Sequence, residues 1–277
     1  MSAQEETKEA PRQEKAPESP QQQPGGKPGG RTGTDLGWTL ARYLVMPVFL
    51  VLVCLGLYLA ISARTLDSIE KRSLSREYIT QKVIEHLEIS AVATVLIVLI
   101  SVTAGVILTR PVMRWVAPYI VGIASTGQAL PSIGVIVLIA VLTGQFGFKI
   151  AVFSLIIYAF LPILRNTMVG IQQVDRSIIE AGRGMGMTNA AVLFKIELPL
   201  AIPIMLAGIR TALIIVVGTA ALATFINAGG MGDIINSGIK LSKDTILITG
   251  SVLTAVLALS VDYVAGIAED VLKPKGL

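Results

Sequence analysis

Residues 89–108 read ISAVATVLIVLISVTAGVIL, twenty consecutive positions without a charged side chain. In helical form such a run is long enough to cross a bilayer core about 30 Å thick. Comparable apolar runs recur along the chain, at 38–62, 116–142, 150–172, 201–226 and 245–268. The sequence therefore predicts an all-α integral membrane protein with about six transmembrane helices.

The composition supports this fold class. Hydrophobic residues make up 53% of the 277 and charged residues only 15%, with a mean hydropathy of +0.70. A soluble domain carries about 25% charged residues. The positive charges behind the net charge of +4 are scattered over loops and tail, and nucleic acid is therefore not an expected partner. The expected surroundings are a lipid bilayer, in the plasma membrane of a prokaryote.

The two ends of the chain differ from the middle. Residues 1–37 hold 11 of the 42 charged side chains, many Pro and Gln, and no long apolar run. Such a segment cannot bury enough surface to offset chain entropy, so we expect a disordered tail. The apolar run at 38–62 is too long for a signal peptide and predicts an extra N-terminal membrane helix. Residues 269–277 are expected to form a short cytoplasmic C-terminal tail.

Lys and Arg in the loops predict the orientation. With both termini in the cytoplasm, the inner segments collect 14 of the 23 basic residues and the outer segments eight, while Arg210 lies within a span. The predicted outer loop 63–88 weakens this bias, because it holds five basic residues. His86, the sole histidine, is expected to face solvent at the outer edge of a span.

Residues 173–200 read QVDRSIIEAGRGMGMTNAAVLFKIELPL, too polar for a span and too apolar for a plain loop. Ser177 and Glu180 have the spacing of a capping box, which predicts a short helix from residue 178. Glycines at 182, 184 and 186 weaken or break it. Thr188 or Asn189 can cap a second short helix, which Pro199 is expected to end. We call the resulting helix–turn–helix at 177–199 the elbow.

The elbow is predicted to expose apolar side chains unless a partner covers them. An exposed apolar patch rimmed by charge indicates an interaction site. The residues expected in this patch are Ile178, Ile179, Met185, Met187, Val192, Leu193 and Phe194.

The elbow resembles the EAA motif of the permeases of type I binding-protein-dependent ABC importers. The matching residues are Glu180, Ala181, Gly182, Gly186, Ile196, Leu198 and Pro199, with Gly182 standing where the motif has alanine. The resemblance implies a five-helix permease domain, here at 86–268. It also implies that the elbow is a cytoplasmic coupling helix that docks on a separate ATPase subunit dimer. The further partners it implies are an extracytoplasmic binding protein and a second permease chain, identical or homologous.

A wider stretch, from about His86 to Val261, is similar to the quaternary-amine branch of these permeases, which import glycine betaine, choline, carnitine or proline betaine. The matching segments are 128–132, 158–167, 180–188, 198–203, 208–212 and 229–232. An amino acid or another small solute remains an alternative cargo. A secondary transporter also remains open, although only Asp262 could serve it as an intramembrane acid.

Several polar and bend-forming residues are candidates for the translocation path or its gates. Arg210 and Asp262 fall in the expected inner half of their spans, where a charge should pair or face water. Arg165 and Asn166 could link their span to the elbow or anchor it at the membrane surface. Gln128 could face the path or bond another helix, and Pro131 should bend its span.

The sequence Gly229-Gly230-Met231-Gly232 precedes the last span and can form a tight re-entrant turn, as an outer gate, a docking loop or an ordinary turn. No G-x-x-x-x-G-K-[ST] phosphate loop occurs, so ATP and Mg²⁺ are expected on the partner ATPase and no cofactor on this chain. No catalytic or metal-binding set of residues is evident. We therefore expect a transport subunit rather than an enzyme.

Overall fold

The computed structural model describes residues 34–272, with side chains from Tyr43 onward. The chain divides into two compact units, 1–43 and 44–277. Of the first unit, only the start of helix α1 (Thr34–Ser62) is described. Residues 1–33 of the predicted tail at 1–37 lie outside the described residues. Residues 34–37 already belong to α1. Within the second unit, the last helix α11 (Asp244–Leu272) runs past residue 269, into the predicted C-terminal tail.

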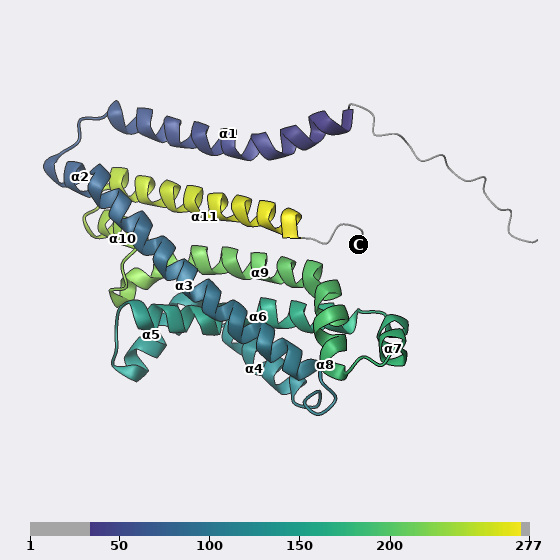
Figure 1. The fold of residues 1–277 in the computed structure, drawn as a ribbon. Coiled ribbons are helices and arrows are strands. Elements are labelled where there is room, and N and C mark those ends of the chain that lie inside the picture. The colour runs from purple at the N-terminus through teal and green to yellow at the C-terminus, as the bar shows by residue number, and fades with distance from the viewer. Residues whose placement is uncertain (1–33, 273–277) are drawn as a thin grey trace, which may run out of the picture. The chain divides into compact units, whose positions relative to one another are not determined.

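Five stretches of helix are long and apolar enough to cross a membrane, which confirms five of the predicted spans. They are Tyr43–Ser62 within α1, α3 (Arg76–Thr109), α6 (Phe148–Gln172), the continuous stretch Asn189–Ile226, and α11. Each forms because its apolar run exceeds the length that a bilayer core requires. Figure 1 shows these helices and the shorter elements between them.

The predicted span at 116–142 is a broken pair of helices. Helix α4 (Ala117–Ala129) and helix α5 (Ser132–Thr143) meet at 103°. Leu130 is extended, with φ −73° and ψ 148°, and Pro131 follows it. Proline has no N–H to donate and disfavours helical backbone in the residue before it, so the break falls here. Counted as one span, the pair brings the number to the predicted six.

The predicted loop 63–88 is largely helical. Asp67 caps the short helix α2 (Ser68–Ser73) by accepting from the Glu70 backbone N–H at 2.8 Å. Ser75 then caps α3, which begins at Arg76, whereas the predicted span began at residue 89. Among the charged residues near the predicted boundary, Lys82 and Glu85 lie on α3 and bond Asp233 and the Gly230 N–H.

Helices α3, α6 and α9 (Leu198–Ala220) form the central packing unit. Their shared core contains Ile89, Ile97, Leu155, Ile163, Ala212 and Val216, all buried. Small residues allow the helices to approach closely, as is common in membrane proteins. At Gly208 on α9, a Cβ would lie 2.6 Å from Asn166 Cβ and 2.9 Å from the Pro162 carbonyl oxygen of α6. Only glycine fits this crossing.

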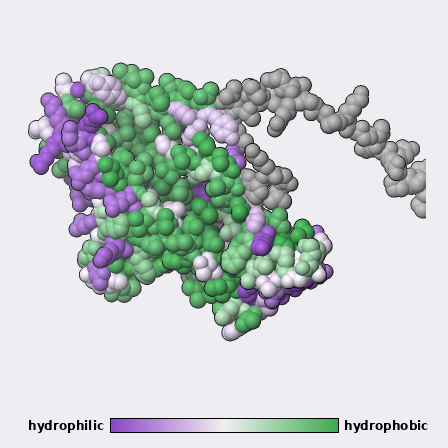
Figure 2. Space-filling view, in the orientation of Figure 1, coloured by the Kyte–Doolittle hydropathy of each residue, from purple (hydrophilic) through white to green (hydrophobic). Residues whose placement is uncertain are grey.

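Hydrophobic residues cover most of the visible surface between two more polar ends (Figure 2). One polar end holds α2 and the short helix α10 (Gly232–Lys240), and the other holds helix α7 (Arg176–Gly184). This pattern is typical of a helical membrane protein, in which apolar side chains face lipid and polar ones gather near water.

Candidate functional site

The first half of the elbow is helix α7, and Asp175 caps it. The Asp175 carboxylate accepts from the Ser177 backbone N–H at 2.8 Å. The predicted capping box from Ser177 to Glu180 is therefore wrong, because the chain enters the helix two residues earlier. The same N–H lowers the pKa of Asp175. The cap thus stabilises α7 above the ordinary aspartate pKa and is lost as the pH falls through the lowered value.

A tight turn reverses the chain after α7. The Met185 and Met187 backbone N–H groups donate to the carbonyls of Ala181 and Gly182, at 3.0 and 3.1 Å. Gly186 has φ +83°, the left-handed conformation in which glycine commonly ends a helix. Thr188 then caps helix α8 (Asn189–Val192) by accepting from the Ala191 N–H at 3.2 Å, as predicted.

The second half of the elbow does not end at Pro199. A single π-helical turn, Leu193–Glu197, follows α8 and continues into α9 without a break. Pro199 lies within this continuous helical stretch, where it has no backbone N–H to donate to the preceding turn. The prediction of a helix end here is wrong, and the elbow is joined directly to a membrane span.

The two halves of the elbow pack against each other at Gly182. This glycine is buried, and a Cβ there would lie 2.6 Å from Ile196 Cδ1 and 3.4 Å from Met187 Sδ. Two residues of the recognised motif, Gly182 and Ile196, are thus brought together. Leu198 packs with the buried residues Ile171, Ala201 and Met205 of α6 and α9, and Pro199 is half-buried beside it. Glu180, Ala181 and Gly186 are exposed.

We expect Gly182→Ala to be tolerated and Gly182→Leu to disrupt the elbow. The alanine methyl meets only the far end of the Ile196 side chain, which can rotate, and alanine favours helix by about 1 kcal/mol over glycine. A leucine has no space and would separate the two halves, at a cost of about 1–3 kcal/mol. Protease sensitivity of the elbow in purified protein measures the difference. Equal protection of both variants would contradict this packing.

An exposed apolar face remains on the elbow. Ile178, Met185 and Phe194 keep 45%, 77% and 67% of their surface exposed. We call these three residues the apolar elbow face. The broader predicted patch is wrong at Val192, which is fully buried, while Ile179, Met187 and Leu193 are half-buried. The turn at Gly186 hides these side chains because it folds the second helix onto the first.

An ion pair that the sequence did not reveal fastens the elbow to α3. Arg110, just after α3, places Nη2 2.6 Å from Oε2 of Glu197 in the π turn. The Glu197 side chain is only 7% exposed and that of Arg110 is 33% exposed. Arg110 also donates to the Val106 carbonyl, at 3.3 Å. No local pattern predicts this contact, since 87 residues separate its partners.

At the other end of α3, the double-glycine loop (residues 227–231) packs onto the helix. Gly229 and Gly230 have φ +87° and +88°, a conformation that other residues rarely adopt. The Gly230 N–H donates to Glu85 Oε2 at 3.0 Å, and a Cβ on Gly229 would lie 2.5 Å from the same oxygen. Gly232 lies against the Ala221 carbonyl, where a Cβ has no room.

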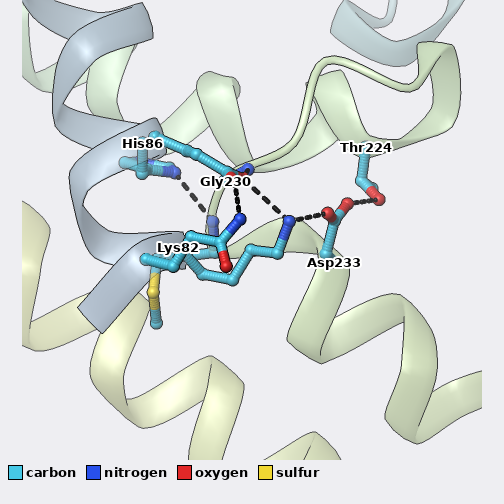
Figure 3. Close-up of polar contacts among 8 residues, drawn as sticks. Lys82, His86, Thr224, Gly230 and Asp233 are labelled. Carbon is cyan, nitrogen blue, oxygen red and sulfur yellow. Dashed lines mark hydrogen bonds and ion pairs between the residues drawn. The ribbon is translucent and has the colours of Figure 1, made fainter. Parts of the chain in front are cut away.

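A polar network surrounds this loop (Figure 3). The Lys82 ammonium lies 2.8 Å from Glu85 and 2.7 Å from Asp233 of α10. Asp233 also accepts from the Thr224 hydroxyl, at 2.6 Å, in the 3-10 turn Ala221–Ile226 that follows α9. One lysine and two carboxylates thereby join α3 to the 3-10 turn and α10, with 151 residues between Lys82 and Asp233.

His86 is buried within this network, so the prediction that it faces solvent is wrong. Its Nε2 donates to the Val217 carbonyl of α9 at 2.9 Å. Its Nδ1 accepts from the Met231 backbone N–H at 3.4 Å. The two bonds position the ring between α3, α9 and the double-glycine loop. The burial of His86 could not be predicted from the sequence, because both of its hydrogen-bond partners are backbone groups far along the chain.

The structure brings Arg210 and Asp262 together. Arg210 Nε lies 2.6 Å from Asp262 Oδ1, and its Nη1 lies 3.4 Å from Glu269 Oε2. Glu269 was not predicted as a partner, because it fell in the expected C-terminal tail. The three residues connect α9 to α11 across two turns of α11.

Arg210→Gln is expected to destabilise the protein by about 2 kcal/mol, since it removes the guanidinium that pairs with the Asp262 carboxylate within the helix bundle. This is less than the 3–5 kcal/mol of a fully buried pair, because the Arg210 side chain is 38% exposed. A thermal-unfolding measurement in detergent tests it. Arg165→Gln is the matched control, since Arg165 is exposed and donates to the Ser125 hydroxyl at 3.0 Å. Equal shifts for both variants would rule out the structural role of Arg210.

The remaining predicted site residues lie apart from the elbow. Arg165 bonds Ser125 of α4, and Asn166 packs against Gly208 of α9. These contacts of Arg165 and Asn166 are with α4 and α9, and they do not include the predicted link to the elbow. Gln128 is half-buried near the end of α4, and Pro131 directly precedes α5. Within residues 34–272, no three His, Cys, Asp or Glu side chains are placed to hold a metal ion.

Comparison with known proteins supports a single family. Residues 101–275 match the profile of the binding-protein-dependent transport system inner membrane components, a range that contains the elbow and the double-glycine loop. The chain is 43% identical over 196 residues to the choline transport system permease protein OpuBB of Bacillus subtilis, covering 71% of this chain and 89% of the relative. It is 37% identical over 214 residues to the osmoprotectant import permease protein OsmY of Salmonella typhimurium, covering 77% and 89%.

Solved structures agree on the fold. The chain superposes on the MetNI methionine ABC transporter in an inward-facing conformation with a TM-score of 0.62 at 24% identity, covering 71% of this chain and 96% of that one. A second match, to an amino acid ABC transporter, has a TM-score of 0.60 at 18% identity and covers 75% and 99%. The helical arrangement is therefore that of ABC importer permeases.

Proposed function

Because this multi-pass membrane protein belongs to the family of binding-protein-dependent transport system inner membrane components, we propose that it is the permease subunit of an osmoprotectant importer. Its cargo is a small quaternary amine such as choline, glycine betaine or carnitine. The names of relatives about 40% identical over most of their length carry this assignment of the solute class.

The elbow is the proposed entry point for energy. Uphill transport requires an energy source, and the sequence holds no phosphate-binding loop with which to hydrolyse ATP. The apolar elbow face supplies exposed hydrophobic side chains at a position where a soluble partner can cover them. We place a dimer of separate ATPase subunits, which carry ATP and Mg²⁺, against this face. The elbow and both termini are then cytoplasmic, in the plasma membrane of a prokaryote.

The transport cycle follows from this placement. Two permease chains, identical or homologous, enclose the path between them. ATP draws the two ATPase subunits together, and each elbow moves with its subunit. Since the elbow continues into α9, this movement swings the membrane helices between inward-open and outward-open arrangements. The double-glycine loop lies at the outer side, where it can act as a gate or as a contact for the binding protein.

Selection of the solute is assigned to a separate extracytoplasmic binding protein. Tight recognition of a quaternary ammonium uses a cage of aromatic faces. Aromatic residues make up only 5% of this chain. The permease therefore needs only a path that a small cation or zwitterion can traverse.

Uptake by the reconstituted importer tests the proposal. The permease is co-expressed with a candidate ATPase and a candidate binding protein from the same genome, and accumulation of labelled choline, glycine betaine, carnitine and methionine is measured in proteoliposomes. We expect ATP-dependent, vanadate-sensitive uptake of one or more of the quaternary amines. Methionine uptake alone would contradict the solute class, and uptake that persists under vanadate would indicate a secondary transporter.

A further inference from the structure

The junction between the elbow and α9 departs from regular α-helix. The π turn at Leu193–Glu197 has wider and less regular hydrogen bonding than α-helix, and such turns occur frequently at functional sites. Pro199 and Pro203 then remove two backbone donors from the first turns of α9. A push on the elbow can therefore bend this junction instead of moving the span.

The ion pair between Arg110 and Glu197 lies at this junction. Glu197 is the last residue of the π turn, and its carboxylate is almost completely buried against the Arg110 guanidinium at 2.6 Å. Arg110 is itself held by the Val106 carbonyl at the end of α3. The pair thus connects the end of the π turn to α3 by a route that avoids both prolines.

Helix α3 is suited to carry this connection further. It contains no proline between Arg76 and Thr109, and the helix from Lys82 to Thr109 spans about 40 Å at 1.5 Å per residue. Its far end holds the double-glycine loop through Glu85 and His86, and holds α10 through the bond from Lys82 to Asp233. Figure 3 shows these bonds meeting between α3 and the α10 region. The helix is therefore fastened at both ends to the segments that must move together.

We propose that α3 is a transmission rod, and that Arg110 and Glu197 are positioning residues that deliver the movement of the elbow to the double-glycine loop. The inference rests on the proposed function, since it assumes that the elbow receives the ATP-driven movement. Helices α3 and α9 form two parallel connections between the elbow and the loop. The ion pair fastens the elbow to α3, the connection that contains no proline.

The test measures movement of the outer end in the complete importer. Phe225, 48% exposed in the 3-10 turn before the loop, is replaced by cysteine after Cys54, the only native cysteine, is changed to alanine. Alkylation by a membrane-impermeant maleimide is then followed with and without ATP and vanadate. The unbraced variants are Glu197→Gln, Arg110→Gln and the double variant. Lys243→Gln is the control, because it removes an ion pair with Asp67 that involves neither α3 nor the double-glycine loop.

We expect ATP and vanadate to change the alkylation rate in the otherwise native complex and in Lys243→Gln. In the three unbraced variants this change should be lost, and uptake per ATP hydrolysed should fall about tenfold, within the range of allosteric coupling free energies. The ATPase should co-purify undiminished. In the double variant neither charge is left without its partner. If the pair mattered for stability alone, the ATP-dependent change in alkylation would therefore return in this variant. Its recovery, or a native complex in which Phe225→Cys never responds to ATP, overturns the inference. Loss of ATPase attachment or of all uptake in the native complex would instead count against the proposed function.

Discussion

Replacing Gly186 with valine is expected to weaken attachment of the ATPase subunit at least tenfold. Gly186 has φ +83° in the turn between the two helices of the elbow. A β-branched residue in this conformation costs about 2 kcal/mol or more, and 1.4 kcal/mol corresponds to a factor of ten. A Cβ would meet no atom within 4 Å, so the whole effect comes from the backbone. The amount of ATPase recovered with tagged permease, titrated against ATPase concentration, measures the loss.

Two matched variants separate the backbone effect from simple bulk. Gly186→Asn should retain most of the attachment, because asparagine tolerates left-handed backbone. Gly184→Ala should be nearly neutral, since Gly184 lies in the last turn of α7 and its Cβ would also meet open space. Equal weakening by Gly184→Ala and Gly186→Val would show that the turn geometry is not what docking requires.

Charging the apolar elbow face is expected to abolish docking without unfolding the permease. Met185→Glu and Phe194→Glu each introduce a carboxylate at a position that is already mostly exposed. The free energy of unfolding of the permease should therefore change little. In an interface, central apolar residues of this kind contribute about 2 kcal/mol or more, and burying an unpaired charge adds to the loss. The double variant should therefore lose ATPase binding and ATP-driven uptake by about 100-fold.

Leu241→Glu is the control for this effect. Leu241 is 46% exposed in the turn between α10 and α11, near the opposite end of the fold. It should bind ATPase normally. Normal ATPase binding by the doubly charged elbow would show that the apolar elbow face is not the docking surface.

The spans could be predicted from sequence because each depends mainly on its own composition. An apolar run such as 89–108 becomes a membrane helix wherever it packs. The start of α3 could not be predicted, because Lys82, Glu85 and His86 look like loop residues until their partners are known. The break between α4 and α5 was signalled by Pro131, but proline also bends continuous membrane helices, so the 103° angle did not follow from the residue alone.

The site was predictable where its geometry is local. The Thr188 cap and the turn at Gly186 follow from residue type and spacing within a few positions. The burial of Val192 and the packing of Ile196 on Gly182 depend on how the two elbow helices close on each other. The ion pair of Arg110 with Glu197 joins residues that are far apart in the chain. Charged residues at such separations give no pattern that a single sequence can reveal.

Site-specific cross-linking from Met185 examines the coupling claim most directly. A photoreactive amino acid is introduced at this position, 77% exposed in the turn of the elbow, and intact cells expressing all subunits are irradiated. Our account predicts a covalent adduct between the permease and the ATPase subunit, which the Gly186→Val change greatly reduces. An adduct with the extracytoplasmic binding protein, or none with the ATPase while uptake continues, would contradict it.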